Sequence, residues 1–353
     1  MQWNAATMSS QRGAREGITR QGGRTQIGFA LGLASVIALA AAPAQAQSTE
    51  GMLGEGMVMY MQMGGNAGDG ATLARTTGAR DAAKAFGLEL IEQYSAWQPE
   101  TMLNHFREGL AASPTCIGIM GHPGSDAFAD LVTEARSAGI VVTSGNAPLT
   151  ELYKEHQAGG FGYAGVDLYT GGYITGQSMV AQGLGSGDKA LVYGLLSEAE
   201  RGQSTLGLKT ALEEAGLSVD YLEISPEVNS DSSLVVPILA AYLANNPDVK
   251  AIGTQHGGVT AFIPKALEDA GKQPGDVVVG GIDLAPATID GLEDGWISTV
   301  LDQQLYLQGF LPVTQCVLSA RYGFTGLFTN TGSGTVTPQT IGALIPLIEK
   351  GIR

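Results

Sequence analysis

Short apolar runs alternate along this chain with longer stretches in which apolar residues recur at helical spacing. The run at 57–63 opens the series, and the residues near 70–86 that follow it have the spacing of a helix. Further strands are predicted at 88–93, 116–120, 140–143, 189–195, 218–224, 249–253 and 276–282. Further helices are predicted near 125–138, 168–183, 200–215, 231–245 and 258–270. Strands that alternate with helices over short links predict parallel sheets covered by helices on both faces.

One junction recurs between a predicted helix and the next strand. Glycine occupies it at 87, 139, 216 and 271. Glycine tolerates the left-handed backbone that ends a helix, and four such helix ends predict two related α/β lobes. The glycine-rich stretch 159–165 is the predicted passage between the lobes. Residues 329–337, rich in Thr and Gly, are predicted to cross again before a short helix at 338–350.

The first 46 residues have the pattern of a secretory signal peptide. Four arginines lie between residues 12 and 24, an uncharged apolar run covers 27–42, and Ala44-Gln45-Ala46 follows. Small residues at these spacings predict cleavage after Ala46 and export to the periplasm. The run is short for a membrane span, although an uncleaved N-terminal anchor remains an alternative. Cleavage leaves 307 residues, which is enough for two domains.

The net charge argues against nucleic acid as a partner. The chain has 19 Lys and Arg against 34 Asp and Glu, a net charge of −15. Removal of the leader, with four arginines and Glu16, makes the net charge −18. An acidic surface of this kind repels phosphate backbones.

Cys116 and Cys316 are the only cysteines. An exported protein can pair them. However, Cys116 opens an apolar strand and Cys316 lies in a helical run, and the sequence does not show their distance. The sequence therefore favours two buried thiols over a disulfide. Two cysteines without clustered histidines predict no zinc site, and neither a metal nor a cofactor is expected.

The common catalytic motifs are missing. The chain has no G-x-S-x-G, no G-x-x-x-x-G-K-S/T and no H-E-x-x-H. The glycines at 183–187 precede a strand, whereas the nucleotide-binding fingerprint follows one, so a turn is predicted there. The sequence therefore predicts a protein that is not an enzyme. An exported α/β hydrolase that acts through Asp69, His122 or His256 is the alternative.

Polar residues gather in the loops that follow the predicted strands, where doubly wound sheets bind ligands. They are amides, carboxylates and two histidines, without the cluster of Lys or Arg that would bind phosphate. This set suits the hydroxyl groups of a ligand. The residues are Asn66, Asp69, His122, Asn146, Glu198, Arg201, Gln255, His256, Asp283 and Gln303.

The chain resembles the ribose-binding-protein-like, sugar-binding family of periplasmic binding proteins over 55–325. The opening block 64–70 with 78–84 and the block from Val277 to Asp283 are similar to blocks of that family. The most specific similarity is 302–309, Asp-Gln-Gln-Leu-Tyr-Leu-Gln-Gly. The resemblance implies an α/β fold of two Rossmann-like, doubly wound lobes joined by a three-stranded hinge. The implied N-terminal lobe is 47–163 plus 302–328, and the implied C-terminal lobe is 164–301 plus 329–353.

The resemblance also implies which residues bind the ligand. Asp283 matches a sugar-binding Asp, and Gln303 matches a hinge-side Gln that contacts ligand. His256 stands where an Asn commonly binds a hydroxyl. The other implied ligand contacts are Asp69, His122, Asn146, Arg201 and Gln255. From the residues alone, Asp283 could equally cap the helix that follows it.

Two departures from the family pattern bear on the ligand. Ala71-Thr72 stands where the family usually has an aromatic pair that stacks on the sugar ring. Ser204 stands where the family usually has an Arg, and Arg201 lies one helical turn earlier. The lost stacking favours a smaller or acyclic solute, or a furanose. The aromatic residues considered as a substitute surface, although packing elsewhere is favoured for each, are Trp97, Phe128, Tyr163 and Tyr169.

The function that the resemblance implies is solute binding. The chain would capture a small sugar or polyol, close its lobes and deliver the solute to the membrane permease of an ABC importer. A monomer without nucleic-acid partners is expected. A protein that presents its ligand to a membrane sensor or chemoreceptor is an alternative that the sequence leaves open.

Overall fold

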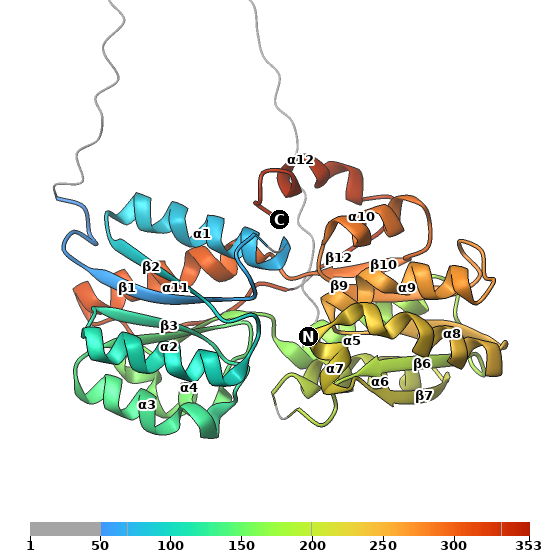
Figure 1. Cartoon of the computed structure of the whole chain (residues 1–353), viewed down its shortest axis with the longest axis horizontal. Helices are drawn as coiled ribbons and strands as arrows, with labels where there is room; N and C mark the ends of the chain where they lie inside the picture. The colour runs from blue at the N-terminus through green and yellow to red at the C-terminus, as the bar shows by residue number, and fades with distance from the viewer. Residues whose placement is uncertain (1–50, 69, 199, 333) are drawn as a thin grey trace, which may run out of the picture. The chain divides into compact units, whose positions relative to one another are not determined.

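The computed structural model describes residues 51–68, 70–198, 200–332 and 334–353. The predicted signal peptide and its cleavage site lie outside these residues, as does Asp69. The described residues belong to one compact unit. Within it, two six-stranded sheets form, and parallel strands dominate both, as the alternating pattern predicts (Figure 1).

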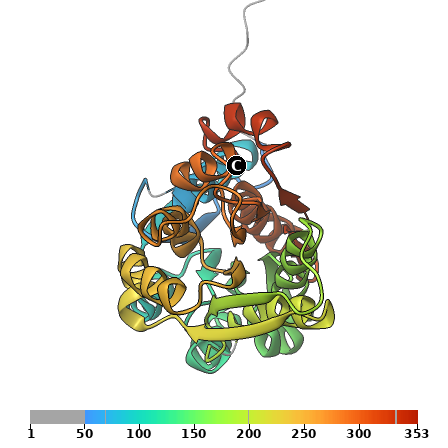
Figure 2. The same cartoon turned by 90° about the vertical axis from the view of Figure 1, so that its right-hand side faces the viewer.

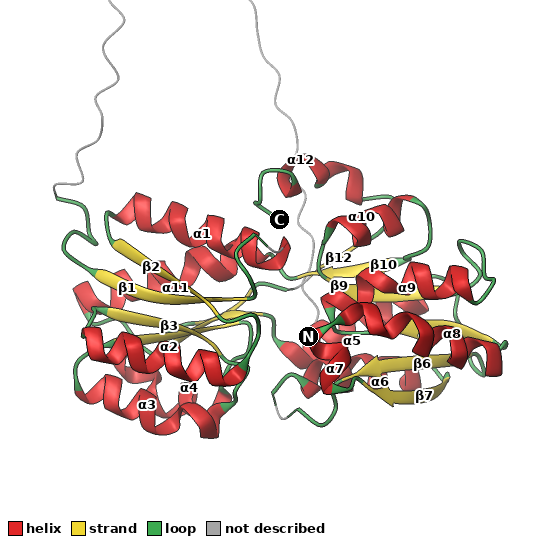
Figure 3. Ribbon diagram, viewed as in Figure 1, coloured by secondary structure: helices red, strands yellow, loops and turns green. Residues whose placement is uncertain are grey.

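The first sheet has the strand order β11-β5-β4-β3-β1-β2, and every pair in it is parallel. Its helices cover both faces, with α1 and α11 on one face and α2, α3 and α4 on the other (Figure 3). The strands are β1 (Val58–Gly64), β2 (Glu89–Tyr94), β3 (Cys116–Met120), β4 (Val141–Gly145), β5 (Gly162–Gly165) and β11 (Phe328–Asn330). The helices are α1 (Gly70–Phe86), α2 (Pro99–Ala112), α3 (Ser125–Ser137), α4 (Thr150–His156) and α11 (Leu305–Tyr322).

The second sheet has the order β12-β10-β9-β8-β6-β7, in which only β12 runs antiparallel to its neighbour among the described strands. Figure 2 turns this sheet toward the viewer. The strands are β6 (Lys189–Gly194), β7 (Ser218–Glu223), β8 (Val249–Gly253), β9 (Val278–Ile282), β10 (Thr299–Asp302) and β12 (Gly334–Val336). The helices are α5 (Leu168–Val180), α6 (Gly202–Glu214), α7 (Pro226–Ser230), α8 (Val235–Asn245), α9 (Gly257–Asp269), α10 (Pro286–Glu293) and α12 (Ile345–Ile348).

The chain passes between the sheets three times: after β5, after β10 and between β11 and β12. The first and third passages are tied together, because the Asn330 side chain accepts hydrogen bonds from the N–H groups of Asp167 and Gly332, both at 3.0 Å. The sequence placed the first passage in the glycine-rich stretch 159–165. That placement was too early, because Gly162–Gly165 forms β5 of the first sheet and the passage follows it.

Glycines allow close helix pairs on both sheets. A Cβ on Gly309 of α11 would lie 1.9 Å from the carbonyl oxygen of Arg75 on α1. In the second sheet, a Cβ on Gly172 of α5 would lie 1.8 Å from the carbonyl oxygen of Ser204 on α6. Only glycine permits these approaches. The two helix pairs therefore hold Arg75 and Ser204 at fixed positions relative to their sheets.

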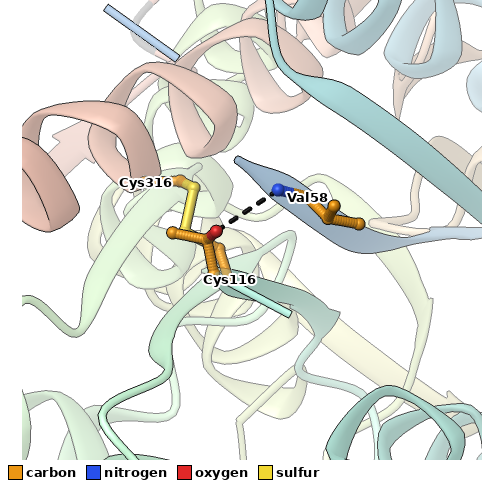
Figure 4. The surroundings of a disulfide bond; sticks show 4 residues. Val58, Cys116 and Cys316 are labelled. Atoms are coloured by element: carbon orange, nitrogen blue, oxygen red, sulfur yellow. Dashed lines mark hydrogen bonds between the residues drawn. A yellow bond between two sulfur atoms is a disulfide. The ribbon is translucent and has the colours of Figure 1, made fainter. Parts of the chain in front are cut away.

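A disulfide joins Cys116 at the start of β3 to Cys316 in α11 (Figure 4). The two Cα atoms lie 6.0 Å apart although 200 positions separate them in sequence. Next to it, the N–H of Val58 donates to Oγ1 of Thr115 at 3.3 Å. The expectation of two buried thiols was wrong. The pairing arises because α11 returns to the first sheet and lies against β3, β4 and β5, a contact that the sequence spacing of the cysteines does not reveal.

Candidate functional site

A cavity of about 490 Å³ opens where the strands of both sheets end, and we call it the inter-sheet cavity. Its lining comes from the loops after β1, β2, β3 and β4 and from those after β6, β7, β8, β9 and β10. Ligands of doubly wound sheets bind at this edge. Seven of the eight predicted ligand residues line the cavity, and the eighth, Asp69, lies outside the described residues. The seven are His122, Asn146, Arg201, Gln255, His256, Asp283 and Gln303.

Asp283 and Gln303 form a hydrogen-bonded pair in the cavity lining. Nε2 of Gln303 donates to Oδ1 of Asp283 at 2.7 Å. A Cβ on Gly257 would lie 2.2 Å from Oδ2, so glycine at that position leaves room for the carboxylate. Burial raises the pKa of Asp283, whereas the Gln303 hydrogen bond and the positive charge of Arg75 lower it. The alternative that Asp283 caps the following helix is not seen, because the N-cap of α10 is Ala285 and no side chain accepts a cap hydrogen bond there.

His256 has both ring nitrogens engaged within the protein. Nδ1 accepts a hydrogen bond from the N–H of Val259 at 3.2 Å and so caps α9. Because Nδ1 is the acceptor, Nε2 carries the proton and donates to Oδ1 of Asn229 at 2.9 Å. Burial, followed by the repulsion of Arg201, lowers the pKa of His256 to about 3. His256 therefore presents a neutral ring to the cavity, and neither nitrogen remains for a ligand hydroxyl.

His122 and Asn146 come from neighbouring strands of the first sheet. Burial, followed by the charges of Arg201 and Arg75, lowers the pKa of His122 well below its usual value, so its ring is also neutral. Its Nδ1 is buried without a hydrogen-bond partner among the described residues. Asn146 has a left-handed backbone, φ 64°, at the end of β4, which asparagine tolerates better than most residues.

Arg201 reaches the cavity from one turn before Ser204, as the sequence analysis allowed. It stands at the start of α6, and its guanidinium donates to Oε2 of Glu198 at 3.2 Å. Ser204 also lines the cavity, and its hydroxyl donates to the carbonyl of Arg201 at 3.0 Å. Burial lowers the pKa of Arg201, and Glu198 opposes that change.

Arg75 lines the cavity from α1, and the sequence analysis missed it. Its side chain is fully buried. It donates to the carbonyl of Met63 at 2.8 Å and to Oε1 of Gln308 at 3.3 Å, while its Nε has no partner among the described residues. Burial lowers its pKa to about 10, against the attraction of Asp283. A signal was present, because Arg75 lies four residues from both Ala71 and Ala79 on the inward stripe of α1.

A chain of hydrogen bonds joins Arg75 to Asp283 across the second passage. Gln308 accepts from Arg75, and its Nε2 donates to Oε1 of Gln303 at 3.3 Å. The same Nε2 also lies 3.3 Å from Oγ1 of Thr331 on the third passage. Gln303 in turn donates to Asp283. One polar network therefore spans both sheets at the inner wall of the cavity.

Trp97 is the one of the four considered aromatic residues that lines the cavity. Its ring lies 5.0 Å from the His122 ring, between centroids, and 5.7 Å from Cζ of Arg75. Phe128 and Tyr163 are fully buried in the core. Tyr169 is 39% exposed and stacks on Tyr173.

The charges of the cavity nearly cancel. Arg75 faces the charge of Asp283, Arg201 is paired with Glu198, and both histidines are neutral. Among the described residues, no group of three or more His, Cys, Asp or Glu is placed to hold a metal ion. The lining thus suits an uncharged molecule with several hydroxyl groups.

Comparison with known proteins agrees with this geometry. Residues 73–321 match the model of the family described as "Periplasmic binding protein domain". The chain belongs to this family. The periplasmic binding protein domain family implies a location outside the cytoplasm, and its members are binding proteins. In the part of the chain that the structure describes, no helix has the length and apolarity to cross a bilayer.

Two curated relatives are similar to this periplasmic binding protein domain. A xylose/arabinose-binding protein of Sulfolobus acidocaldarius is 27% identical over 60% of this chain and 53% of its own length. A D-ribose/D-allose-binding protein of Pseudomonas aeruginosa is 26% identical over 51% of this chain and 55% of its own. The chain thus matches about half the length of these relatives.

A solved structure shares the fold. It is a carbohydrate transporter from Acidothermus cellulolyticus in complex with myo-inositol, with a TM-score of 0.70 at 20% identity. The match covers 84% of this chain and 99% of that one. The two sheets and their alternating helices are therefore those of a type I periplasmic binding protein, as predicted.

Proposed function

We propose that this chain binds a sugar or small polyol in the inter-sheet cavity and delivers it to the membrane permease of an ABC importer. The supporting observation is the Asp283–Gln303 pair in a cavity whose charges nearly cancel. A carboxylate held in this way accepts strong hydrogen bonds from hydroxyl groups, and the guanidinium groups of Arg75 and Arg201 donate them. The relatives that bind xylose, arabinose, ribose or allose support the same substrate class.

The backbone of the cavity also supports a binding role. Seven residues other than glycine have positive φ among the described residues, and four of them line the cavity: Ala96, Trp97, Asn146 and Asp283. Such conformations cost energy and gather at sites where a ligand is held. We also propose that the protein acts as a monomer in the periplasm after cleavage behind Ala46. The residues assigned to the ligand are part of this proposal, with Arg75 added to the predicted set and His256, whose ring nitrogens are both engaged, left out of it.

Thermal unfolding of the chain from Gln47 onward, with candidate solutes at millimolar concentration, tests the function. The panel contains D-xylose, L-arabinose, D-ribose, D-allose and myo-inositol. A solute that binds only the folded state stabilises it and so raises the melting temperature. At a solute concentration of a hundred times Kd, the gain in free energy of unfolding is about 2.7 kcal/mol. We expect at least one member of the panel to do so.

Asp283→Asn is the variant for this test, because asparagine keeps the left-handed backbone at φ 72° and removes only the charge. We expect it to abolish the solute-dependent shift, since a charge-assisted hydrogen bond is replaced by a weaker one. Asp290→Asn, at an exposed position of α10, is the matched control and should keep the shift. If no solute in the panel shifts the wild-type protein, the proposed function is wrong.

A further inference from the structure

The surface that Trp97 presents to the inter-sheet cavity bears on the shape of the ligand. The sequence lacks the aromatic pair after the first loop, which favoured a smaller or acyclic solute, or a furanose. The structure places an indole ring in the cavity from a different loop, the one after β2. We propose that Trp97 stacks on a ring-shaped sugar or cyclitol, an inference that rests on the proposed function. The site would then prefer cyclic ligands to open-chain alditols.

The loop that carries Trp97 is held firmly. The carbonyl oxygen of Gly64 accepts hydrogen bonds from the N–H groups of Ser95 and Trp97, at 3.1 and 3.2 Å, and from the Ser95 hydroxyl. Ala96 and Trp97 both have left-handed backbones, with φ of 49° and 60°. Such a conformation is costly for residues with a Cβ and persists only where the surroundings impose it. The indole is therefore in place before any ligand arrives.

Gly64 provides the space for the indole. A Cβ at this position would lie 2.3 Å from Cζ3 and 2.5 Å from Cη2 of Trp97. The six-membered part of the ring thus packs directly on the backbone of Gly64, at the end of β1. Part of the side chain also packs against the buried apolar cluster that contains Met102 and Phe106.

Arg75 completes this wall of the cavity. Its Cζ lies 5.7 Å from the centroid of Trp97, within the range of cation–π attraction. Its side chain is fully buried, and its Nε lacks a partner among the described residues. The cavity lining thus combines an aromatic ring with the guanidinium that lies over it, an apolar surface beside hydrogen-bond donors. A sugar ring has matching features, since its C–H groups form an apolar face and its hydroxyls lie around the rim.

An open-chain alditol has one hydroxyl more than the ring form of its sugar, in place of the ring oxygen, and has no fixed flat face. It cannot cover the indole without losing the freedom of several torsions. The ring forms of the proposed solutes lose no such torsional freedom. The preference for a ring form over its alditol therefore arises from Trp97 rather than from Asp283. This assignment separates the role of the indole from that of the polar residues.

Calorimetric titration of matched pairs tests the inference. The pairs are D-xylose with xylitol, D-ribose with ribitol and D-allose with allitol. For wild-type protein we expect the ring form of a bound sugar to have an affinity at least about tenfold above that of its alditol, which is 1.4 kcal/mol. Trp97→Ala should bring this ratio close to one, whereas Trp97→Phe should keep most of it.

Gly64→Ala provides a second variant that retains the indole. The added Cβ displaces the ring from its position, so the ratio should fall although the tryptophan is still present. Circular dichroism confirms that each variant is folded. Asp283→Asn should abolish the binding of sugar and alditol alike.

Fluorescence gives an independent measurement, because the chain from Gln47 onward contains only two tryptophans, Trp97 and Trp296. A bound sugar should change the emission of wild-type protein and of Trp296→Phe, and Trp97→Phe should lose that change. An unchanged ratio in Trp97→Ala, with sugar binding still abolished in Asp283→Asn, would overturn this inference and leave the proposed function standing. Absence of any binding by wild-type protein would instead overturn the proposed function.

Discussion

At the scale of single residues, the type of side chain and its availability to a ligand are separate properties. His256 lines the inter-sheet cavity, yet Val259 and Asn229 occupy its two nitrogens. Gln255 lines it too, with Nε2 on the carbonyl of Thr254 and with Oε1 buried and unpartnered among the described residues. His256 therefore contributes to the stability of the site rather than to ligand hydrogen bonds.

The pKa of His256 makes its contribution measurable. An unfolded chain protonates this ring below about pH 6.5, whereas the folded protein keeps it neutral down to about pH 3. The unfolded state thus binds more protons between these values, so the free energy of unfolding should fall as the pH drops from 6.5. The contribution of this one ring is at most about 1.4 kcal/mol per pH unit.

Urea unfolding of wild-type protein and of His256→Asn at pH 7 and pH 5 measures the effect. Asparagine keeps a capping side chain for α9 but has no ring to protonate. We expect the variant to lose less stability than the wild type between the two pH values. His156→Asn, outside the cavity, is the control, and an equal pH dependence in wild type and His256→Asn would refute the assignment.

Some residues of the candidate site could be predicted because their position directly after a strand is enough to place them at the edge of the sheet. Asp283 and Gln303 directly follow strands, and strand ends converge on one edge of a parallel sheet. Arg75 lies within a helix, and its exposure depends on how α1 packs against α11. Trp97 follows β2, but its orientation depends on two left-handed residues and on Gly64, which no periodicity encodes.

At the scale of elements, pairs of helices fix the positions of side chains that line the cavity. Gly78 and Gly309 bring α1 and α11 together, since a Cβ on Gly78 would lie 2.0 Å from the carbonyl oxygen of Tyr306. This close approach sets the 3.3 Å hydrogen bond between Arg75 and Gln308. The network that reaches Asp283 therefore depends on the spacing of two helix backbones.

Gly309→Ala should separate these helices. The new Cβ would meet backbone atoms of α1, which cannot move aside as a flexible side chain would. We expect a loss of stability of about 1–3 kcal/mol and weaker solute binding, because Arg75 moves away from Gln308. Gly342→Ala, where nothing lies within 4 Å of the added atom, is the control. Thermal unfolding and calorimetry measure both quantities, and equal values for the two variants would contradict the prediction.

The elements themselves could largely be predicted from apolar periodicity. Strands β3 and β4 are buried at every position; β3 is a continuous apolar run, and β4 begins with two valines before the buried Thr143 and Ser144. Helix α2 is absent from the sequence analysis, although Pro99 at its start and the buried Met102, Phe106 and Gly109 have helical spacing. Helix α4 has seven residues, too few to show a period.

At the scale of the whole molecule, the two sheets are connected in two ways. Three passages of chain join them. In addition, Glu200, from the loop after β6, accepts hydrogen bonds from Oγ of Ser125 at 3.3 Å and from N–H of Thr150 at 3.3 Å. The adjacent Arg201 lines the cavity, so neighbouring residues of one loop contact the ligand site and the opposite sheet's helices.

Glu200→Gln should shorten the lifetime of the bound solute. An amide accepts weaker hydrogen bonds than a carboxylate, and a loss of about 1 kcal/mol corresponds to a roughly fivefold faster dissociation rate. Stopped-flow displacement of the solute measures this rate. Glu134→Gln, at an exposed position of α3, is the control. The contact has no role in retaining solute if both variants release it at the wild-type rate.

The architecture of two sheets could be predicted, whereas the disulfide could not. Alternating strands and helices determine the class of fold through local spacing. The bond between Cys116 and Cys316, which are 200 positions apart in sequence, requires that α11 returns to β3. Contacts of this range depend on the packing of the whole chain, which local patterns do not encode.

Whether that disulfide is formed depends on where the protein is produced. Thiols stay reduced in the cytosol of most bacteria and become oxidised once a protein is exported. If the proposed signal peptide directs export, material produced in the cytosol from Gln47 onward would therefore differ covalently from exported material. A mass measurement with and without a thiol-alkylating reagent distinguishes the two. Affinities measured on different preparations can be compared only after that check.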